Sequence, residues 1–319
     1  EAPGVSLEPG DISVTGGELI SLTPTTDPKI WNALVRPTQG SASATQLEVS
    51  IAAGLFTDAA GNTNSAPASL TLPIDTVLPT VAITSTTTIG SDNKLQAGEE
   101  ATITFTLSEA SKDFTEGDIA VSGGTLSAFA PVSASSSAGA GYTQYTATFI
   151  PTADSTLPAS IQVASGKFTD SAGNENADGQ DTNNLASFQV DTVRPTVALS
   201  ASVSQLTAGN KTSLITFVFS EDPGTGFTLA DLVVQGGELS NLSTEGTIRT
   251  ATFTPTVGST TAGRIALKAT VDGGDGFTDA ANNANAAVTA LDIAIDTIRP
   301  TVAITEATGK TALKANDTA

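Results

Sequence analysis

The chain repeats itself three times, and this repetition constrains its fold more than any other feature of its 319 residues. One recurring stretch reads IDTVLPTVAIT at 74–84, VDTVRPTVALS at 190–200 and IDTIRPTVAIT at 295–305. A second reads FTDAAGNTN at 56–64, FTDSAGNEN at 168–176 and FTDAANNAN at 277–285. The copies lie roughly 110 residues apart, which is the length of a whole domain and far exceeds a solenoid repeat. We therefore expect a first repeat at 1–74, a second at 75–190, a third at 191–295, and the start of another at 296–319.

Each repeat has the pattern of an antiparallel β-sandwich. About seven short stretches rich in Val, Ile, Thr and Phe alternate apolar with polar residues, and turns of Gly, Pro, Asn and Ser separate them. Helical periodicity is nearly absent. This strand count predicts an all-β fold of tandem immunoglobulin-like antiparallel β-sandwiches. The Gly-Gly pairs at 16–17, 123–124 and 236–237 mark a tight turn or bulge, and Trp31 is expected to anchor a core or a sheet edge.

The two ends of the sequence match different parts of a repeat. Glu1 aligns with Glu109, so the first repeat is expected to lack its first two strands, and residues 296–319 supply a linker and a first strand. The sequence allows two origins for this arrangement. Either it is an arbitrary cut through a longer array, or residues 296–319 pair with the incomplete first repeat of another copy. The second origin predicts a head-to-tail filament built by strand addition.

The composition excludes most catalytic chemistry. The chain has no His and no Cys, which removes Ser-His-Asp and Cys-His catalysis, thiolate and imidazole zinc sites and all disulfides. Its 33 acidic and 13 basic residues give a formal charge of −20, which repels nucleic acid and anionic membranes and attracts cations. No apolar run approaches the roughly 18 residues of a membrane span. We therefore expect a protein that is not an enzyme, binds no nucleic acid and does not insert into a membrane.

The FTD stretch places acidic residues where other acids should converge. In an immunoglobulin-like sandwich, the incoming linker, the end of the second strand and the loop before the last strand share one end of the domain. Carboxylates gathered there would repel one another without a cation between them, and oxygen ligands alone specify a hard ion such as Ca²⁺. The ligands expected in the second repeat are Asp75, Glu109, Asp118, Asp170 and Asn174. Those expected in the third are Asp191, Glu221, Asp231, Asp279 and Asn283. If another copy adds its strand, its Asp296 joins Glu1, Asp11, Asp58 and Asn62 in a further set.

The FTD loop could also form without an ion. Asp and Asn in turns commonly bond to their own backbone in the absence of any metal. Gly61 and Gly173 allow the positive φ that would curl the loop, and Asn282 is the residue type that tolerates this conformation best after Gly. A pair of glycosidase carboxylates is disfavoured because it needs a cleft, whereas these acids recur at every domain junction.

The linkers between the repeats are short. Pro79, Pro195 and Pro300 fix φ just before the first strand of each following unit, and the sequence has no flexible Gly/Ser spacer between units. Short linkers with an ion bound at the joint predict a stiff array of domains.

In combination these motifs resemble the bacterial immunoglobulin-like repeats of giant surface adhesins and biofilm-associated proteins exported by type I secretion. The motifs are DTxxPTV, the strand ends Ser108-Glu109 and Ser220-Glu221, the Gly-Gly stretch and FTDxAGN, and they cover nearly the whole chain. The resemblance implies an extender region at the bacterial cell surface, where neighbouring repeats are one another's partners and calcium at the domain junctions stiffens the array. The residues that it implicates are Asp75, Glu109, Asp170, Asp191, Glu221 and Asp279.

A ligand-binding module is the alternative function, with a glycan or a host protein held on an exposed loop surface. The candidate loops are PVSASSSAGAGYTQY at 131–145, with Tyr142 and Tyr145, and ENADGQDTNN at 175–184. Both are more simply explained as solvated surface loops, because low-complexity insertions are tolerated there.

Overall fold

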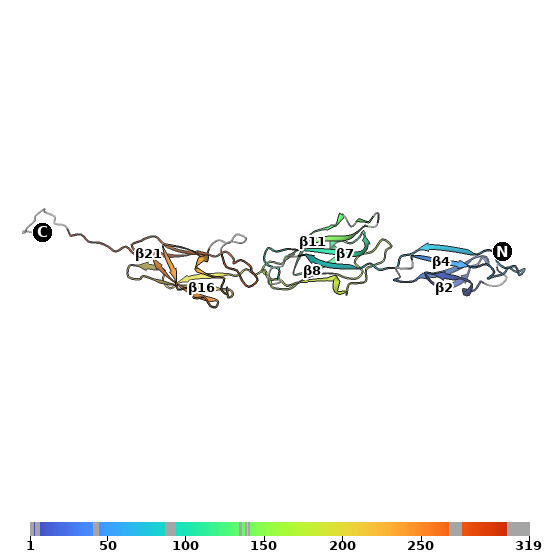
Figure 1. The fold of residues 1–319 in the computed structure, drawn as a ribbon, viewed down its shortest axis with the longest axis horizontal. Helices are drawn as coiled ribbons and strands as arrows, with labels where there is room; N and C mark the ends of the chain where they lie inside the picture. The colour runs from blue at the N-terminus through green and yellow to red at the C-terminus, as the bar shows by residue number, and fades with distance from the viewer. Residues whose placement is uncertain are drawn as a thin grey trace, which may run out of the picture. The chain divides into compact units, whose positions relative to one another are not determined.

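A computed structural model describes residues 3, 7–40, 45–86, 94–133, 136–137, 139, 141–267 and 276–304. The described residues are almost entirely strands and turns, so the predicted all-β fold is confirmed (Figure 1). The helical elements among them are three-residue 3-10 turns: η1 (Pro9–Asp11), η2 (Glu116–Asp118), η4 (Thr182–Asn184) and η5 (Leu229–Asp231). The chain divides into two compact units. The first holds Glu1–Thr88, Glu100–Thr152 and Pro158–Phe188, and the second holds Ile89–Glu99, Ala153–Leu157 and Gln189–Ala319.

The first repeat contributes five strands to the first unit. They are β1 (Ser13–Thr15), β2 (Gly17–Pro24), β3 (Trp31–Pro37), β4 (Gln46–Ile51) and β5 (Ala68–Pro73). One sheet has the order β1-β4-β5, and β2 pairs with β3 in a second. Leu47 is buried, and the half-buried Trp31 begins β3, as expected of an edge anchor. Residues 305–319 and Glu1 lie outside the described residues, so strand addition by the tail stays a prediction.

The second repeat forms the rest of the first unit. Its strands are β6 (Val81–Thr86), β7 (Ala101–Ser111), β8 (Ile119–Ser122), β9 (Gly124–Pro131), β10 (Ser136–Ser137), β11 (Gly141–Pro151), β12 (Ala159–Val163) and β13 (Leu185–Phe188). One sheet has the order β10-β11-β7-β6 with β9 also on β11, and the other has the order β13-β12-β8. Alternate residues of β7 are buried, including Ile103 and Phe105, which is the periodicity of a strand with one face on a core.

The third repeat lies in the second unit. Its strands are β14 (Val197–Ala201), β15 (Gln205–Thr207), β16 (Ser213–Phe219), β17 (Leu232–Gln235), β18 (Gly237–Ser240), β19 (Ile248–Pro255), β20 (Gly263–Leu267) and β21 (Leu291–Asp296). The sheets have the orders β14-β16-β19-β18 and β15-β21-β20-β17. Phe217, Phe253, Ile265 and Ile293 are fully buried in the core of this repeat.

One strand pair departs from the expected antiparallel arrangement. β15 pairs with β21 in parallel, with Leu206 opposite Ile295, and the isolated bridge between Leu95 and Val190 in the same unit is also parallel. The cause is a break in the first stretch of the repeat. β14 pairs with β16 in one sheet, and the chain then crosses so that β15 joins the other sheet beside the last strand.

The Gly-Gly pairs occupy turns that leave no room for a side chain. Gly123 separates β8 from β9 with φ of +71°, and a Cβ there would lie 2.8 Å from the Cα of Ala159. A Cβ on Gly124 would overlap the ring of Phe149. The predicted tight turn is therefore confirmed at this pair.

Candidate cation site

The FTD loop folds around its own Asp side chain. In the second repeat, Oδ1 of Asp170 accepts hydrogen bonds from the backbone N–H of Ala172 at 2.8 Å and of Asn174 at 2.9 Å. The side-chain amide of Asn174 donates to the other carboxylate oxygen at 2.8 Å. Asp58 with Asn62 and Asp279 with Asn283 make the same set of bonds. The loop is thus an Asx-turn in all three copies, a hydrogen-bonding pattern that the sequence analysis also allowed.

The turn requires a left-handed residue just before the Asn. Gly61 has φ of +83°, Gly173 has +91° and Asn282 has +64°. The prediction that Asn282 replaces Gly because it tolerates this conformation is confirmed.

A second Asn closes the loop, and the sequence analysis missed it. Oδ1 of Asn176 accepts from the backbone N–H of Lys167 at 2.7 Å, and its amide donates to the carbonyl of Ala164 at 3.0 Å. Asn64 makes the equivalent bonds to Leu55 and Ala52. The signal was available, because FTDAAGNTN, FTDSAGNEN and FTDAANNAN all end in Asn.

The Phe and Thr of the motif fix the loop to the sandwich. Phe168 is buried, with its ring centroid 5.3 Å from that of Phe114. Thr169 donates to Asp113 from its hydroxyl at 2.7 Å and from its backbone N–H at 2.9 Å. Although burial opposes it, hydrogen bonds from Thr169 and Ser111 hold the pKa of Asp113 below its ordinary value. These contacts of Phe168 and Thr169 attach the FTD loop to the sandwich without involving a ligand.

The linkers are hydrogen-bonded on both sides. On one side the Asn of the FTD loop reaches the linker carbonyl: Asn174 Nδ2 lies 3.3 Å from Asp75 O, and Asn283 Nδ2 lies 2.9 Å from Asp191 O. On the other side the linker Thr bonds to a loop of the preceding repeat. Thr76 donates to the carbonyl of Thr38 at 2.7 Å.

The same Thr contact recurs at the later linkers. The hydroxyl of Thr192 accepts from Ser155 N at 2.9 Å and lies 3.2 Å from Ser155 O. The hydroxyl of Thr297 makes the matching pair of bonds with Ser259. The recurrence of the DT linker within this chain thus has a structural cause: each Thr ties the linker to the repeat that precedes it.

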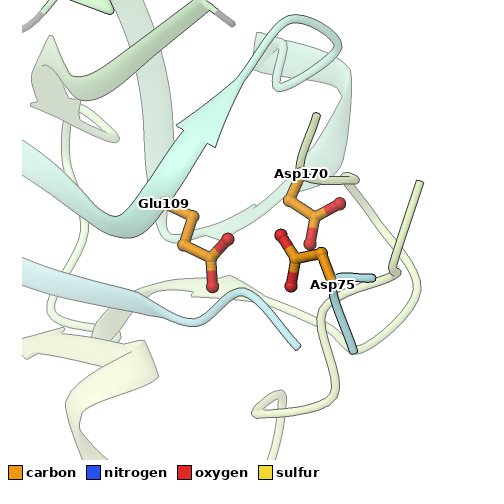
Figure 2. A group of neighbouring side chains, drawn as sticks. All are labelled: Asp75, Glu109 and Asp170. Carbon is orange, nitrogen blue, oxygen red and sulfur yellow. The ribbon is translucent and has the colours of Figure 1, made fainter. Parts of the chain in front are cut away.

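Three carboxylates meet beside the first linker. Asp75, Glu109 and Asp170 each offer an oxygen, and these oxygens lie within 4.8 Å of one another (Figure 2). Asp75 follows β5, Glu109 lies near the end of β7, and Asp170 belongs to the FTD loop. Burial, then Asp75, then Asp170 raise the pKa of Glu109 above its ordinary value. The possible metal ligands are all carboxylate oxygens, which fits a hard cation such as Ca²⁺ or Mg²⁺.

The corresponding acids of the third repeat have a lysine among them. Nζ of Lys94 lies 3.1 Å from Oδ2 of Asp191. Burial, Asp279 and Asp191 raise the pKa of Glu221, and Lys94 opposes this shift. Among the described residues, only Asp75, Glu109 and Asp170 form a group of three acids with the spacing given above.

Several of the expected ligands have different partners. Asp118 accepts from the backbone N–H and the hydroxyl of Thr115, both at 2.8 Å, and Asp231 bonds to Thr228 in the same way. Asp11 accepts from Glu8 N at 2.8 Å. These carboxylates cap η2, η5 and η1, so the structure does not bring them into the group.

The further set expected across two copies is not assembled within one chain. Asp58 and Asn62 bond to each other in the first FTD loop, and Asp296 accepts from the backbone N–H of Ile298 at 3.2 Å. Glu1 lies outside the described residues, and the set stays a prediction.

Each of the two candidate ligand-binding stretches contains buried residues. Tyr145 is a core residue: its ring stacks on Phe129 at 5.4 Å, and its hydroxyl donates to Ser111 O at 3.0 Å. In the stretch 175–184, Asp178 is buried and accepts from the backbone N–H of Val81 at 2.6 Å. Tyr145 and Asp178 therefore belong to the sandwich and not to a free loop. The described residues also contain no helix of the length and apolarity that a membrane span requires.

Comparisons with known proteins were made for sequence families and solved structures. A search of curated proteins gave no match. The structure of domains 4–9 of the surface layer protein SbsC aligns at 11% identity with a TM-score of 0.22, over 89% of this chain and 39% of that one. Invasin, a bacterial integrin-binding protein, aligns at 13% with a TM-score of 0.30, over 80% and 56%.

A third structure is SGBP-B of Bacteroides ovatus, in complex with a mixed-linkage heptasaccharide. It aligns at 14% identity with a TM-score of 0.17, over 90% of this chain and 60% of that one. The chain thus spans 39% to 60% of the length of these structures, and the TM-scores are too low to support an argument about function.

The family comparison is decisive, because it covers most of the chain. The family model described as "Bacterial Ig-like domain" matches residues 3–74, 75–187 and 191–295. The chain therefore belongs to the family of bacterial Ig-like domains, and it carries three matched copies in tandem.

Proposed function

We propose that the chain is a non-catalytic extender of a bacterial cell-surface protein, in which linkers clamped by hydrogen bonds and a bound calcium ion hold successive repeats in a fixed arrangement. The observation that carries the proposal is the attachment of each of the first two linkers on both of its sides. Thr76 bonds to the repeat before it, and the carbonyl of Asp75 accepts from Asn174 of the repeat after it. A linker held at both ends has little freedom to act as a hinge, which is what an extender requires.

The composition supports a structural role. A chain without His or Cys has few routes to catalysis, and Asp118, Asp170 and Asp231 are hydrogen-bonded within turns and caps. A charge of −20 suits a solvated array that attracts cations and stays apart from anionic surfaces. The expected location is the bacterial cell surface, and the expected partners are neighbouring repeats.

Calcium is proposed as the ion that joins Asp75, Glu109 and Asp170. Glu109 and Asp170 belong to the sandwich of the second repeat and Asp75 to its linker, so an ion held by all three would fix the linker to that repeat. Burial raises the pKa of Glu109 most, and the ion offsets the repulsion by Asp75 and Asp170 that raises it further. With the ion at ten times its dissociation constant, binding contributes about 1.4 kcal/mol to the stability of the folded chain.

Calorimetric melting in EDTA and in several millimolar calcium tests the ion. Calcium should raise the melting temperature of the chain but not that of Glu109→Gln. Glu116→Gln is the matched control, because it removes the same charge from an exposed residue on the same repeat. An equal response of the two variants would exclude this site.

Small-angle scattering tests the stiffness separately. Replacing Thr76 by Val and Asn174 by Ala removes one bond on each side of the first linker. The variant should give a broader distribution of dimensions than the parent chain, in EDTA as well as in calcium. Unchanged scattering would mean that these contacts do not set the stiffness of the joint.

Ligand binding is the second candidate function. A pocket of about 400 Å³ on the second repeat is lined by Phe129, Tyr142, Lys112 and Glu116, among others. Aromatic walls with a few polar groups are typical of small-ligand sites. A glycan-array signal that Tyr142→Ala abolishes would favour this function over the extender.

A further inference from the structure

We infer that Lys94 is the resident cation of the acidic residues in the third repeat, so that this joint is closed by an ammonium group and the first joint by a divalent ion. The inference rests on the proposed function, because it assigns calcium to the group of Asp75, Glu109 and Asp170 alone.

The backbone places Lys94 beside the second linker. The N–H of Leu95 donates to the carbonyl of Gln189, and its carbonyl accepts from the N–H of Asp191, both at 2.9 Å. The side chain of Leu95 is fully buried. Bonds on both sides of Leu95 leave the neighbouring Lys94 little freedom in position, so its contact with Asp191 follows from the strand pairing.

Asn283 also holds the segment around Lys94 beside the second linker. Its Oδ1 accepts from the N–H of Ala97 at 2.7 Å, while its amide donates to the carbonyl of Asp191. The segment that carries Lys94 is thereby bonded to both the linker and the FTD loop. The backbone around Lys94 is therefore held at the joint, and its side chain, which is 41% exposed, reaches Asp191 from there.

Among the described residues, only one of the two groups of acids has a neighbouring ammonium: Lys94 lies beside the group of Asp191, Glu221 and Asp279, and the other group is Asp75, Glu109 and Asp170. Nζ of Lys94 lies 3.1 Å from Asp191, whose side chain is 20% exposed, and Lys94 also attracts Glu221. In the part of the chain that the structure describes, none of the ion pairs involves Asp75, Glu109 or Asp170. A bound ammonium uses carboxylate oxygens that a metal ion would need, and it repels any second cation. The set around Asp191 therefore does not fit a divalent ion while Lys94 is present.

The third repeat supplies a natural substitute for Lys94. Leu206 pairs in parallel with Ile295, just before Asp296, as Leu95 pairs with Val190, just before Asp191. Gln205 therefore holds the position that Lys94 holds in the second repeat. Lys94→Gln exchanges the residue for one that the same fold already accepts there.

Counting bound calcium on the full chain by equilibrium dialysis tests the inference. Across the groups of acids around Asp75 and Asp191, the parent chain should bind one calcium ion and Lys94→Gln should bind two. Adding Glu221→Gln to the Lys94→Gln variant should return the count to one. Lys112→Gln is the matched control, since it removes the same charge from an exposed position and should leave the count at one. In EDTA, Lys94→Gln should also melt at a lower temperature than Lys112→Gln.

The outcomes separate this inference from the proposed function. A parent chain that binds an ion lost in Asp191→Asn would overturn the inference, and so would a Lys94→Gln variant that gains no ion. A parent chain that binds no ion would overturn the calcium assignment at Asp75, Glu109 and Asp170. The gain of one ion in Lys94→Gln would still support the role of Lys94 in that case.

Discussion

The side chain of Asn283 joins Asp191 to two other segments: its amide donates to the carbonyl of Asp191 at 2.9 Å, and its oxygen accepts from the N–H of Ala97 at 2.7 Å. The same amide also donates to Asp279 within the FTD loop. One buried amide therefore holds a loop of the third repeat, the linker and a loop of the second repeat. The second linker is thus bonded through Asn283 to a segment on each side of it.

Replacing Asn283 by Ala should destabilise the third repeat by about 1–3 kcal/mol, because buried partners lose their hydrogen bonds. The measurement is the calorimetric transition of the third repeat, with scattering to detect a looser joint. Asn62→Ala is the matched control, since Asn62 lies in the same motif on an exposed loop and bonds to Asp58. A smaller loss for Asn283 than for Asn62 would contradict the prediction.

Asn176→Ala should open the FTD loop of the second repeat and lower the free energy of unfolding by about 1–3 kcal/mol. Asn176 is 2% exposed and bridges Lys167 with Ala164. Asn64 makes the equivalent bonds in a half-buried position, so Asn64→Ala should be milder. Amide hydrogen exchange of Lys167 reports the opening directly, and continued protection there would argue against the assigned role.

In EDTA, Glu109 should make the second repeat more stable as the pH falls. Burial, Asp75 and Asp170 raise its pKa above the ordinary 4.5, so the folded state keeps a proton that the unfolded chain has lost. This contribution is fully present below about pH 4.5 and is lost as the pH rises through the raised pKa.

Melting temperatures of the parent chain and Glu109→Gln across that range isolate the effect, because the difference between them removes the other titrating groups. With calcium present the trend should reverse, since the ion binds the ionised carboxylate. Parallel pH curves for the two proteins in EDTA would show that Glu109 is not perturbed.

Arg249 is a buried charge that should tolerate only particular replacements. Its side chain is fully buried, 3.0 Å from Asp222, and it donates to the carbonyls of Gly224 and Phe227. Arg249→Ala should cost about 3 kcal/mol or more, because it leaves a cavity and unpaired carbonyls.

Tyrosine provides the comparison for Arg249. Arg249 lies opposite Phe217 as Tyr145 lies opposite Phe105, so the second repeat has Tyr at the same position. Arg249→Tyr should therefore lose less stability than Arg249→Ala in urea unfolding. Equal losses would mean that the hydrogen bonds of the guanidinium group outweigh the volume that it fills.

Much of the fold could be predicted because its signals are local. The alternation in ATITFTLSE specifies β7, and the positive φ of Asn282 follows from its alignment with Gly61 and Gly173. The parallel pairing of β15 with β21 could not be predicted, because the register of two strands far apart in sequence depends on which sheet the chain enters after β14.

The candidate site was predictable where topology brings strand ends together, as for Asp75, Glu109 and Asp170. Asp118 was expected there as well, but it bonds to a nearby residue and caps η2 instead. Thr115 lies three residues before it, and the two form a capping box whose bonds form within one turn.

Lys94 was not predictable by the same reasoning. It belongs to the repeat before the acids that it contacts and lies 97 residues from Asp191 in sequence. The long-range pairing of Leu95 with Val190 brings the two together, and Asn283 supports it. Its role therefore emerges from the structure and not from a motif.

The parallel pairing of β15 with β21 also bears on how the third repeat responds to mechanical force. The chain enters this repeat just before β14 and leaves it just after β21. Once β14 has separated from β16, a pull on the two ends draws β15 and β21 in opposite directions along their length, so the hydrogen bonds between them are sheared together and not peeled apart one at a time. Rupture in this geometry requires several bonds to break at once, so we expect this short pair of strands to resist stretching of the repeat.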